Sequence, residues 1–380
     1  MDTNLASMPI VDVDTHYTEP PGLWTDLAPA SLKDRAPRVH SDSDGKQFWV
    51  VDEDMKLGPV GYCVIKPDGG KELGVVTLER FEDMHPGASE AGARLAVMDE
   101  HGITQQILYP NILGFAGSFV MNIKDVALRN FCVLAYNEHA AQLQADSGGR
   151  LLPQALLPLW DMDLAVAELI RCHESFGLTG VVMTDSPELW QLPTLSEGYW
   201  DSLWTEAQDR GLPINFHIGG GASIGSLWAG MDEPTSIAAM SSLADITNMR
   251  CIVNLIFSGL LDRYPALNFV SVESGMGWIP FLLELGEYQM GQNGVTSLSL
   301  TPLEYFQRQI YASYWFETDV AYAVERLGPD NIMPETDFPH PACLYPSVKE
   351  QVQASLGDLP EDVQRKVLYE TARRVYQLGA

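Results

Sequence analysis

The stretch IVDVDTHYTEP, residues Ile10–Pro20, points most directly to the fold of this sequence. Apolar and polar side chains alternate in it, which is typical of a β-strand whose successive residues face opposite sides. Asp14 and His16 then share one face at the end of the strand, with Asp12 further back. Aspartate and histidine are metal ligands in proteins. Two such residues near the start of a chain can equally lie on the surface, so a metal site requires partners elsewhere in the sequence.

The composition is that of a globular chain without a nucleic-acid or membrane partner. The chain has 380 residues, of which 46% are hydrophobic and 19% charged, and a large α/β barrel needs about 250. The net charge of −28 argues against binding to nucleic acid or an anionic membrane. There is no run of 18 apolar residues and no signal-peptide pattern at the N-terminus. The five scattered cysteines suit a reducing cytoplasm and exclude a cysteine-based metal site.

Short apolar segments alternate with helical patterns through most of the chain. The predicted strands lie near Val11 and Ile107 and at 151–159, 178–184, 212–218, 268–273, 314–318 and 331–337. The predicted helices lie at 91–100, 123–145, 164–176, 199–210, 234–263, 278–289, 302–309 and 321–327. Eight strands in such an alternation favour a closed parallel (β/α)8 TIM barrel. A doubly wound open sheet is the alternative, but no G-x-G-x-x-G motif follows the first strand.

Two segments lie outside this alternation. Between about residues 38 and 92 the pattern changes to short β-like runs, FWVVDE at 48–53 and YCVIKP at 62–67, followed by the turn PDGG and ELGVVTL. We predict that this segment is a β-rich insertion after the first strand. Residues 360–378 contain an amphipathic helix that is expected to pack on the barrel. The whole chain, 1–380, is thus predicted to form one barrel domain.

Ligand-type residues follow several of the predicted strands. In a (β/α)8 barrel the functional side chains gather at the carboxyl ends of the strands. These ends carry His217, Glu273 and Asp337 in addition to the first pair. Histidine and carboxylate are the ligands that zinc and similar divalent ions prefer. A lone histidine there can be a core residue and a lone aspartate can cap a helix, but several at matching strand ends predict one metal site.

Four motifs together carry a family resemblance: VDVDTH, NFHIGGG, ESGMGWIP and ETDFPH. They resemble the amidohydrolase superfamily, and more narrowly its aminocarboxymuconate-semialdehyde and resorcylate decarboxylase branch. The resemblance extends over nearly the whole chain. It implies that Asp14, His16, His217 and Asp337 hold the metal. The family more commonly has His-x-His at the first pair and a histidine where this chain has Glu273. It also implies a homo-oligomer, a dimer or larger.

The resemblance implies one divalent metal ion, with Zn²⁺ expected and Mn²⁺ as the second candidate. Superfamily members with two ions use a carboxylated lysine after the fourth strand, and this chain has no lysine between Lys124 and Lys349. The expected catalytic residues are His217, Asp337 and Glu273. Asp337 is expected to move a proton, and Glu273 to act as a general base or to anchor a basic group.

The expected reaction is non-oxidative decarboxylation of a small carboxylated aromatic or unsaturated acid in the cytoplasm. Two alternatives stay open: hydrolysis of a C–C, ester, lactone or amide bond by hydroxide formed at the metal, and a metal-binding barrel without turnover. His340 is expected to contact the substrate carboxylate or to hydrogen-bond a metal ligand. Arg94, His85 and Trp278 are candidates for the wall of the substrate pocket, although packing in the core or at the surface is the simpler explanation for each.

Overall fold

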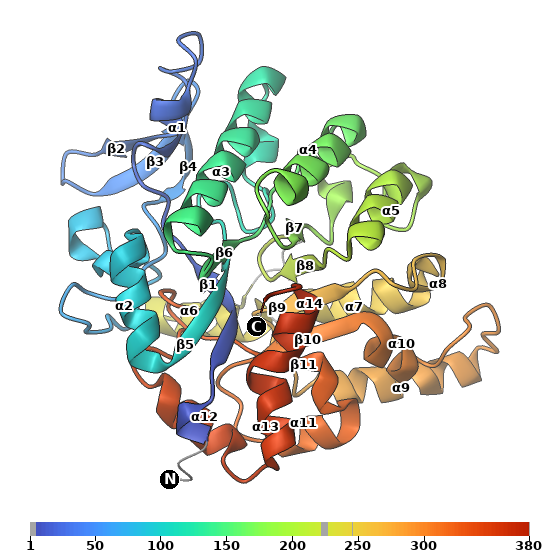
Figure 1. The fold of residues 1–380 in the computed structure, drawn as a ribbon. Helices are drawn as coiled ribbons and strands as arrows, with labels where there is room; N and C mark the ends of the chain where they lie inside the picture. The colour runs from blue at the N-terminus through green and yellow to red at the C-terminus, as the bar shows by residue number, and fades with distance from the viewer. Residues whose placement is uncertain (1–4, 222–226, 245, 380) are drawn as a thin grey trace.

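The computed structural model describes residues 5–221, 227–244 and 246–379. Parallel strands form its centre, and helices surround them (Figure 1). Almost all strand residues are buried, as expected for a parallel sheet covered by helices. In chain order the central strands are β1 (Ile10–His16), β5 (Ile103–Tyr109), β6 (Leu151–Pro153), β7 (Val181–Met183), β8 (Ile214–His217), β9 (Phe269–Val272), β10 (Ile310–Tyr314) and β11 (Ile332–Pro334).

Two runs of strands, β1-β5-β6 and β11-β10-β9-β8-β7, meet at both of their edges. Parallel bridges join Ala155 to Val181 at one seam and Thr15 to Phe338 at the other. At the second seam, the backbone nitrogen of Asp337 donates to the carbonyl of Asp14 at 2.9 Å. The predicted (β/α)8 barrel is therefore confirmed, and the seam brings residue 337 beside residue 14.

Several helices begin or end with a recognisable capping residue. The side chain of Thr301 and that of Glu304 form a reciprocal capping box at the start of one helix, and Gly102 ends another in the left-handed conformation. The predicted single helix at 234–263 is instead three helices, α6 to α8. The helices are α1 (Leu23–Leu27), α2 (Ala91–His101), α3 (Val126–Asp146), α4 (Met162–Glu174), α5 (Asp201–Arg210), α6 (Glu233–Ala244), α7 (Ile246–Phe257), α8 (Leu260–Arg263), α9 (Ile279–Gln292), α10 (Pro302–Gln309), α11 (Val320–Leu327), α12 (Val348–Leu356), α13 (Glu361–Arg365) and α14 (Thr371–Val375). Within the described residues, no helix has the length and apolar character needed to cross a membrane.

The insertion after β1 contains a small antiparallel sheet of β2 (Arg38–Ser41), β3 (Gln47–Val51) and β4 (Met55–Pro59), which extends to one side of the barrel (Figure 1). The prediction that YCVIKP is a strand is wrong. This segment has no regular ladder, and Cys63 and Ile65 are buried in a second apolar cluster with Phe338. The apolar residues of this segment pack against the loop after β11. In the sequence alone, such a run of apolar residues resembles a strand.

Two of the predicted barrel strands have other boundaries in the structure. The predicted strand at 314–318 lies at Ile310–Tyr314, because Ile310 is extended at the very end of α10 and no turn residue separates the helix from the strand. The predicted strand at 151–159 has ladder bonds only over Leu151–Pro153. Both errors concern position along the chain and leave the order of the elements unchanged.

The C-terminal helical segment, α13 to α14, packs against β1 and β11 and ends with Tyr376 beneath the barrel. The buried Tyr376 hydroxyl donates to Oδ1 of Asn215 at 2.7 Å, and Nδ2 of Asn215 donates to the carbonyl of Val181 at 2.9 Å. These bonds connect the C-terminal segment to β8 and, through Asn215, to β7.

Candidate active site

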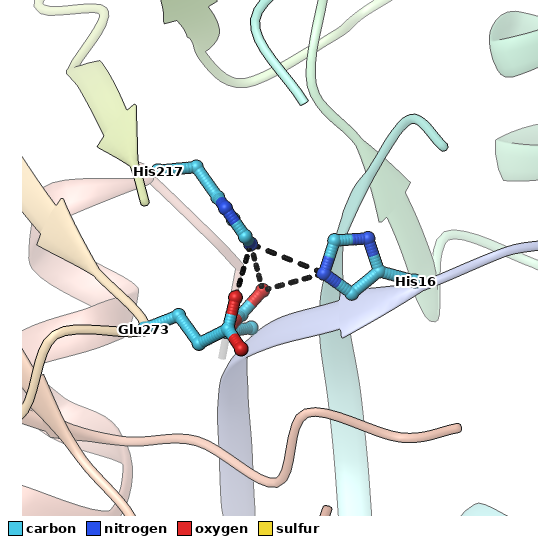
Figure 2. Close-up of side chains that lie close together, drawn as sticks. His16, His217 and Glu273 are labelled. Carbon is cyan, nitrogen blue, oxygen red and sulfur yellow. Dashed lines mark hydrogen bonds and ion pairs between the residues drawn. The ribbon is translucent and has the colours of Figure 1, made fainter. Parts of the chain in front are cut away.

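Two histidine rings lie edge-on to each other at the carboxyl ends of the strands. The Nε2 atoms of His16 and His217 lie 3.1 Å apart, and both residues are buried. Oδ1 of Asp14 lies 3.7 Å from the first and 3.5 Å from the second. Oε2 of Glu273 lies 3.2 Å from Nε2 of His217, so that this carboxylate and both rings converge on one point (Figure 2). The structure therefore brings together residues from β1, β8 and the end of β9.

Asp337 and His340 extend this cluster beyond His16. Oδ1 of Asp337 lies 3.8 Å from Nε2 of His16 and 3.2 Å from Nδ1 of His340. The His340 ring stacks on the His16 ring with centroids 3.6 Å apart and planes 14° apart. Nε2 of His340 lies 2.9 Å from Oδ1 of Asn111, whose Nδ2 donates to the carbonyl of Tyr17 at 3.3 Å. That second bond orients the Asn111 amide, so its oxygen faces His340 and accepts the Nε2 proton.

Two of the carboxylate residues have a strained backbone. Glu273 has φ +53° and Asp337 has φ +56°, in the left-handed region that side-chain-bearing residues seldom adopt. Such conformations cost of order 1–3 kcal/mol each and concentrate at functional sites. Glu273 comes directly after β9 and Asp337 stands three residues after β11, and both carboxylates lie in the donor cluster.

Arg94, which we expected in the wall of the substrate pocket, instead holds the backbone of β1. Its guanidinium is fully buried and donates to the carbonyl of His16 at 2.5 Å and to that of Gly87 at 2.6 Å. A third bond reaches Oε1 of Gln106 at 3.3 Å. Each of the three guanidinium nitrogens therefore has an acceptor within the protein, which favours a positioning role for Arg94 at His16.

Asp12 also has a structural role. Its carboxylate accepts hydrogen bonds from the backbone and hydroxyl of Thr336, at 2.9 and 2.6 Å, and from Nε2 of Gln106 at 3.0 Å. These bonds join β1 to its neighbours on both sides, and they keep the strand end that carries Asp14 and His16 in register.

The donor atoms fit a divalent cation. Both carboxylate oxygens of Asp14 and of Asp337 are buried without a hydrogen-bond partner, and a buried carboxylate is costly unless it is paired or bound to a metal. Donor atoms bound to one ion at about 2.1 Å lie about 3.0 Å apart at right angles and about 4.2 Å apart on opposite sides. The separations of 3.1 to 3.8 Å around the two histidine nitrogens fall within that interval.

Burial sets the protonation of these groups. It lowers the pKa of His217 to about 4 and holds the pKa of His16 well below its usual range. Burial, reinforced by the neighbouring Asp337, raises the pKa of Asp14 well above its ordinary value. Neutral imidazoles are the form that binds metal, so the two rings are already in the state that a cation requires.

Several residues of the site were not predicted from the sequence. The Phe115 ring packs 4.6 Å from the His217 ring and 5.0 Å from the His16 ring, between centroids. Tyr62, from the insertion, lies 5.9 Å from the rings of both Phe115 and His340. Their loops give no motif in the sequence. A Cβ at Gly219 would lie 3.1 Å from the Phe115 ring, which explains a glycine after β8.

Glu335 was also missed, although the sequence contained a signal for it. It stands two positions before Asp337, so alternation at the end of a strand places both on the same side. Its buried Oε2 accepts the backbone N–H of Glu273 at 3.2 Å. Burial and the proximity of Asp14 raise the pKa of Glu335 well above its ordinary value.

The two other expected wall residues, His85 and Trp278, make local contacts within the described part of the chain. Nδ1 of His85 accepts the N–H of Gly87 at 3.0 Å, and the His85 ring meets that of Phe338. The Trp278 indole donates to the carbonyl of Ser274 at 2.7 Å. These contacts cap local turns, and a role of either residue toward the substrate stays a prediction.

Comparisons with known proteins identify the family of this chain. The family model described as amidohydrolase matches residues 11–378. A gamma-resorcylate decarboxylase from Polaromonas sp. is 26% identical over 273 residues, which cover 65% of this chain and 76% of the relative. An amidohydrolase structure from Mycobacterium avium subsp. paratuberculosis superposes with a TM-score of 0.74 at 22% identity over 98% of both chains. A dihydroxybenzoic acid decarboxylase from Polaromonas sp., solved with manganese and 2-nitroresorcinol, gives a TM-score of 0.61 at 18% identity over 98% of this chain and 97% of that one. Because the family model spans almost the whole chain, this protein belongs to the amidohydrolase family and is an enzyme of that family.

Proposed function

We propose that this enzyme decarboxylates a small carboxylated aromatic or unsaturated acid with the help of one divalent metal ion. The observation that carries the proposal is the convergence of the buried, unpartnered carboxylates of Asp14 and Asp337 on the paired nitrogens of His16 and His217. Two relatives of this chain are named gamma-resorcylate decarboxylase and 2-amino-3-carboxymuconate-6-semialdehyde decarboxylase, which supports the reaction class.

The residues that would hold the ion are Asp14, His16, His217 and Asp337. When bound, a divalent ion supplies the positive charge that holds the substrate carboxylate and a neighbouring oxygen. That charge is needed because the surrounding carboxylates repel an anion and Arg94 is engaged by backbone carbonyls. Zn²⁺ is the ion expected from the sequence, and the manganese in a relative's structure supports Mn²⁺ as well.

Asp337 is the proposed proton donor. Decarboxylation breaks the bond between the substrate carbon and its carboxyl carbon, and the electron pair stays on the substrate carbon. A proton from the Asp337 carboxyl then forms the new C–H bond as CO₂ leaves. Overall, the substrate carboxylate and one proton are converted into a product that carries hydrogen in place of the carboxylate, and CO₂. His340, with Nδ1 3.2 Å from Oδ1 of Asp337, is placed to return a proton to it.

The aromatic side chains over the cluster suit a flat substrate. The Phe115 ring lies tilted beside the His217 ring and the Tyr62 ring lies edge-on to the His340 ring. Stacked or edge-on aromatic contacts stabilise by about 0.5–1.5 kcal/mol beyond burial alone. We propose that they form the pocket wall for the ring or conjugated chain of the acid.

The test is a panel of hydroxybenzoic acids and conjugated diacids, assayed for CO₂ release with Mn²⁺ or Zn²⁺, alongside esters and lactones. The native enzyme is expected to release CO₂ from at least one acid, and Asp337→Asn to reduce that rate at least a hundredfold. Acid release from an ester or lactone, with no CO₂ from any acid, would establish the hydrolase alternative and overturn the proposal. The homo-oligomer and the cytoplasmic location stay predictions, and light scattering of the purified protein tests the first.

A further inference from the structure

We propose that Glu273 is a metal ligand of this site and that Glu335 holds it in the ligating position. The proposal rests on the function proposed above and assigns a residue that the sequence left open between a general base and an anchor for a basic group. It concerns the position at which the family commonly has a histidine.

Glu273 lies within ligating distance of the other donors. Its Oε2 is 3.2 Å from Nε2 of His217, close to the separation of adjacent ligands around one ion, about 3.0 Å. One donor atom each from Asp14, His16, His217 and Glu273 lie within 4.8 Å of one another. The same is true of His16, Glu273, Asp337 and His340. Glu273 is therefore common to both groups, at the side of the cluster nearest to β9.

The backbone of Glu273 is held in a conformation that glycine would adopt at lower cost. Its φ of +53° is in the left-handed region, and its N–H is bonded to the buried Oε2 of Glu335 at 3.2 Å. That conformation directs the carboxylate back toward His217, as Figure 2 shows. A side chain kept at a strained position by a buried partner points to a function for its carboxylate.

The extra carboxylate changes the kind of ion that the site suits. With Glu273 the donors are the imidazoles of His16 and His217 and the carboxylates of Asp14, Asp337 and Glu273. Five donors with an oxygen majority suit an ion that accepts five or six ligands, such as Mn²⁺, whereas Zn²⁺ sites commonly have three or four protein ligands. Glu273 is thus expected to raise the affinity for Mn²⁺ more than that for Zn²⁺.

The first experiment measures metal binding directly. The metal-free full-length enzyme is titrated with Mn²⁺, and free Mn²⁺ is quantified by electron paramagnetic resonance. Zn²⁺ affinity is measured by competition. Glu273→Gln is expected to weaken Mn²⁺ binding at least tenfold and Zn²⁺ binding less. Glu19→Gln, which alters another buried glutamate outside both donor groups, is expected to leave Mn²⁺ binding within about threefold. Equal Mn²⁺ affinity of native and Glu273→Gln enzyme overturns the proposal.

The second experiment tests Glu335 as a positioning residue. Glu335→Leu removes the acceptor of the Glu273 N–H and is expected to weaken Mn²⁺ binding as Glu273→Gln does. Glu335→Gln retains a carbonyl acceptor and is expected to restore binding to within about threefold of native. Circular dichroism verifies folding of each variant before titration. If Glu335→Leu folds and binds Mn²⁺ like the native enzyme, the positioning role is wrong.

The two proposals fail in different ways. Native enzyme that releases CO₂ and binds Mn²⁺, together with a Glu273→Gln variant that binds Mn²⁺ equally well, refutes only the ligand role of Glu273. Native enzyme that binds Mn²⁺ through Glu273 but releases CO₂ from no acid refutes the proposed reaction and leaves the ligand role intact.

Discussion

The Nε2 atoms of His16 and His217 lie 3.1 Å apart, although 201 positions separate these residues in the chain. Burial lowers the pKa of both rings, so both are neutral at neutral pH. Two neutral ring nitrogens at this distance either share one proton or point their lone pairs at a cation. The unpartnered oxygens of Asp14 and Asp337 on either side favour the cation.

Replacement of His217 by alanine is therefore expected to remove the metal. We expect the native enzyme to hold one equivalent of a divalent ion and the variant to bind at least tenfold more weakly. The measurement is elemental analysis after dialysis, with His40→Ala as the control because His40 lies exposed on β2. A His217→Ala protein that retains a full equivalent would contradict the site.

Asn111 is expected to act through His340. Asn111→Leu removes the oxygen that accepts the His340 Nε2 proton, and a lost buried hydrogen bond costs about 1–3 kcal/mol. We expect kcat to fall about tenfold with little change in KM. In Asn111→Asp a carboxylate oxygen can still accept the Nε2 proton, so kcat is expected to stay closer to the native value than in Asn111→Leu. A kcat of Asn111→Leu equal to that of the native enzyme would exclude this role.

Glu19 is expected to make stability depend on pH. Burial raises the pKa of Glu19 from 4.5 to about 7, although its Oε1 accepts the N–H groups of Asn111 and Ile112. Between these two values the folded protein binds the proton and the unfolded chain does not. Stability is therefore lost as pH rises from about 4.5 to 7, by up to about 3 kcal/mol. Glu19→Gln should match the native protein near pH 4.5 and exceed it at pH 8 in urea unfolding. Parallel stability curves of the two proteins would contradict this expectation.

Arg94→Met distinguishes a structural role from a substrate contact. It removes the hydrogen bonds that Arg94 donates to the carbonyls of His16 and Gly87. We expect a loss of about 3 kcal/mol in stability and weaker metal binding, because His16 is no longer held. Urea unfolding and metal titration are the measurements. Native stability together with a strongly raised KM would instead restore the expectation of a substrate contact.

Much of the architecture follows from local patterns in the chain. Apolar segments of strand length alternate with helical spacing, and this alone favours a parallel barrel. The ligand-type residues follow as well, because the carboxyl ends of parallel strands meet at one edge. Asp14 and His16 could thus be placed beside His217 and Asp337 before any distance was known, and the structure brings these residues together.

The remaining features depend on contacts between segments that are distant in the chain. Whether YCVIKP becomes a strand or a packed loop depends on the segment around Phe338. Arg94 was expected to meet a substrate, but its burial against the carbonyl of His16 engages its charge inside the protein. The position of the Glu273 carboxylate depends on a left-handed backbone and on a bond to Glu335. The spacing of residues along a strand determines which face of the strand each side chain occupies. The residue that the side chain contacts on that face depends on how distant segments pack together, and no single stretch of sequence contains that information.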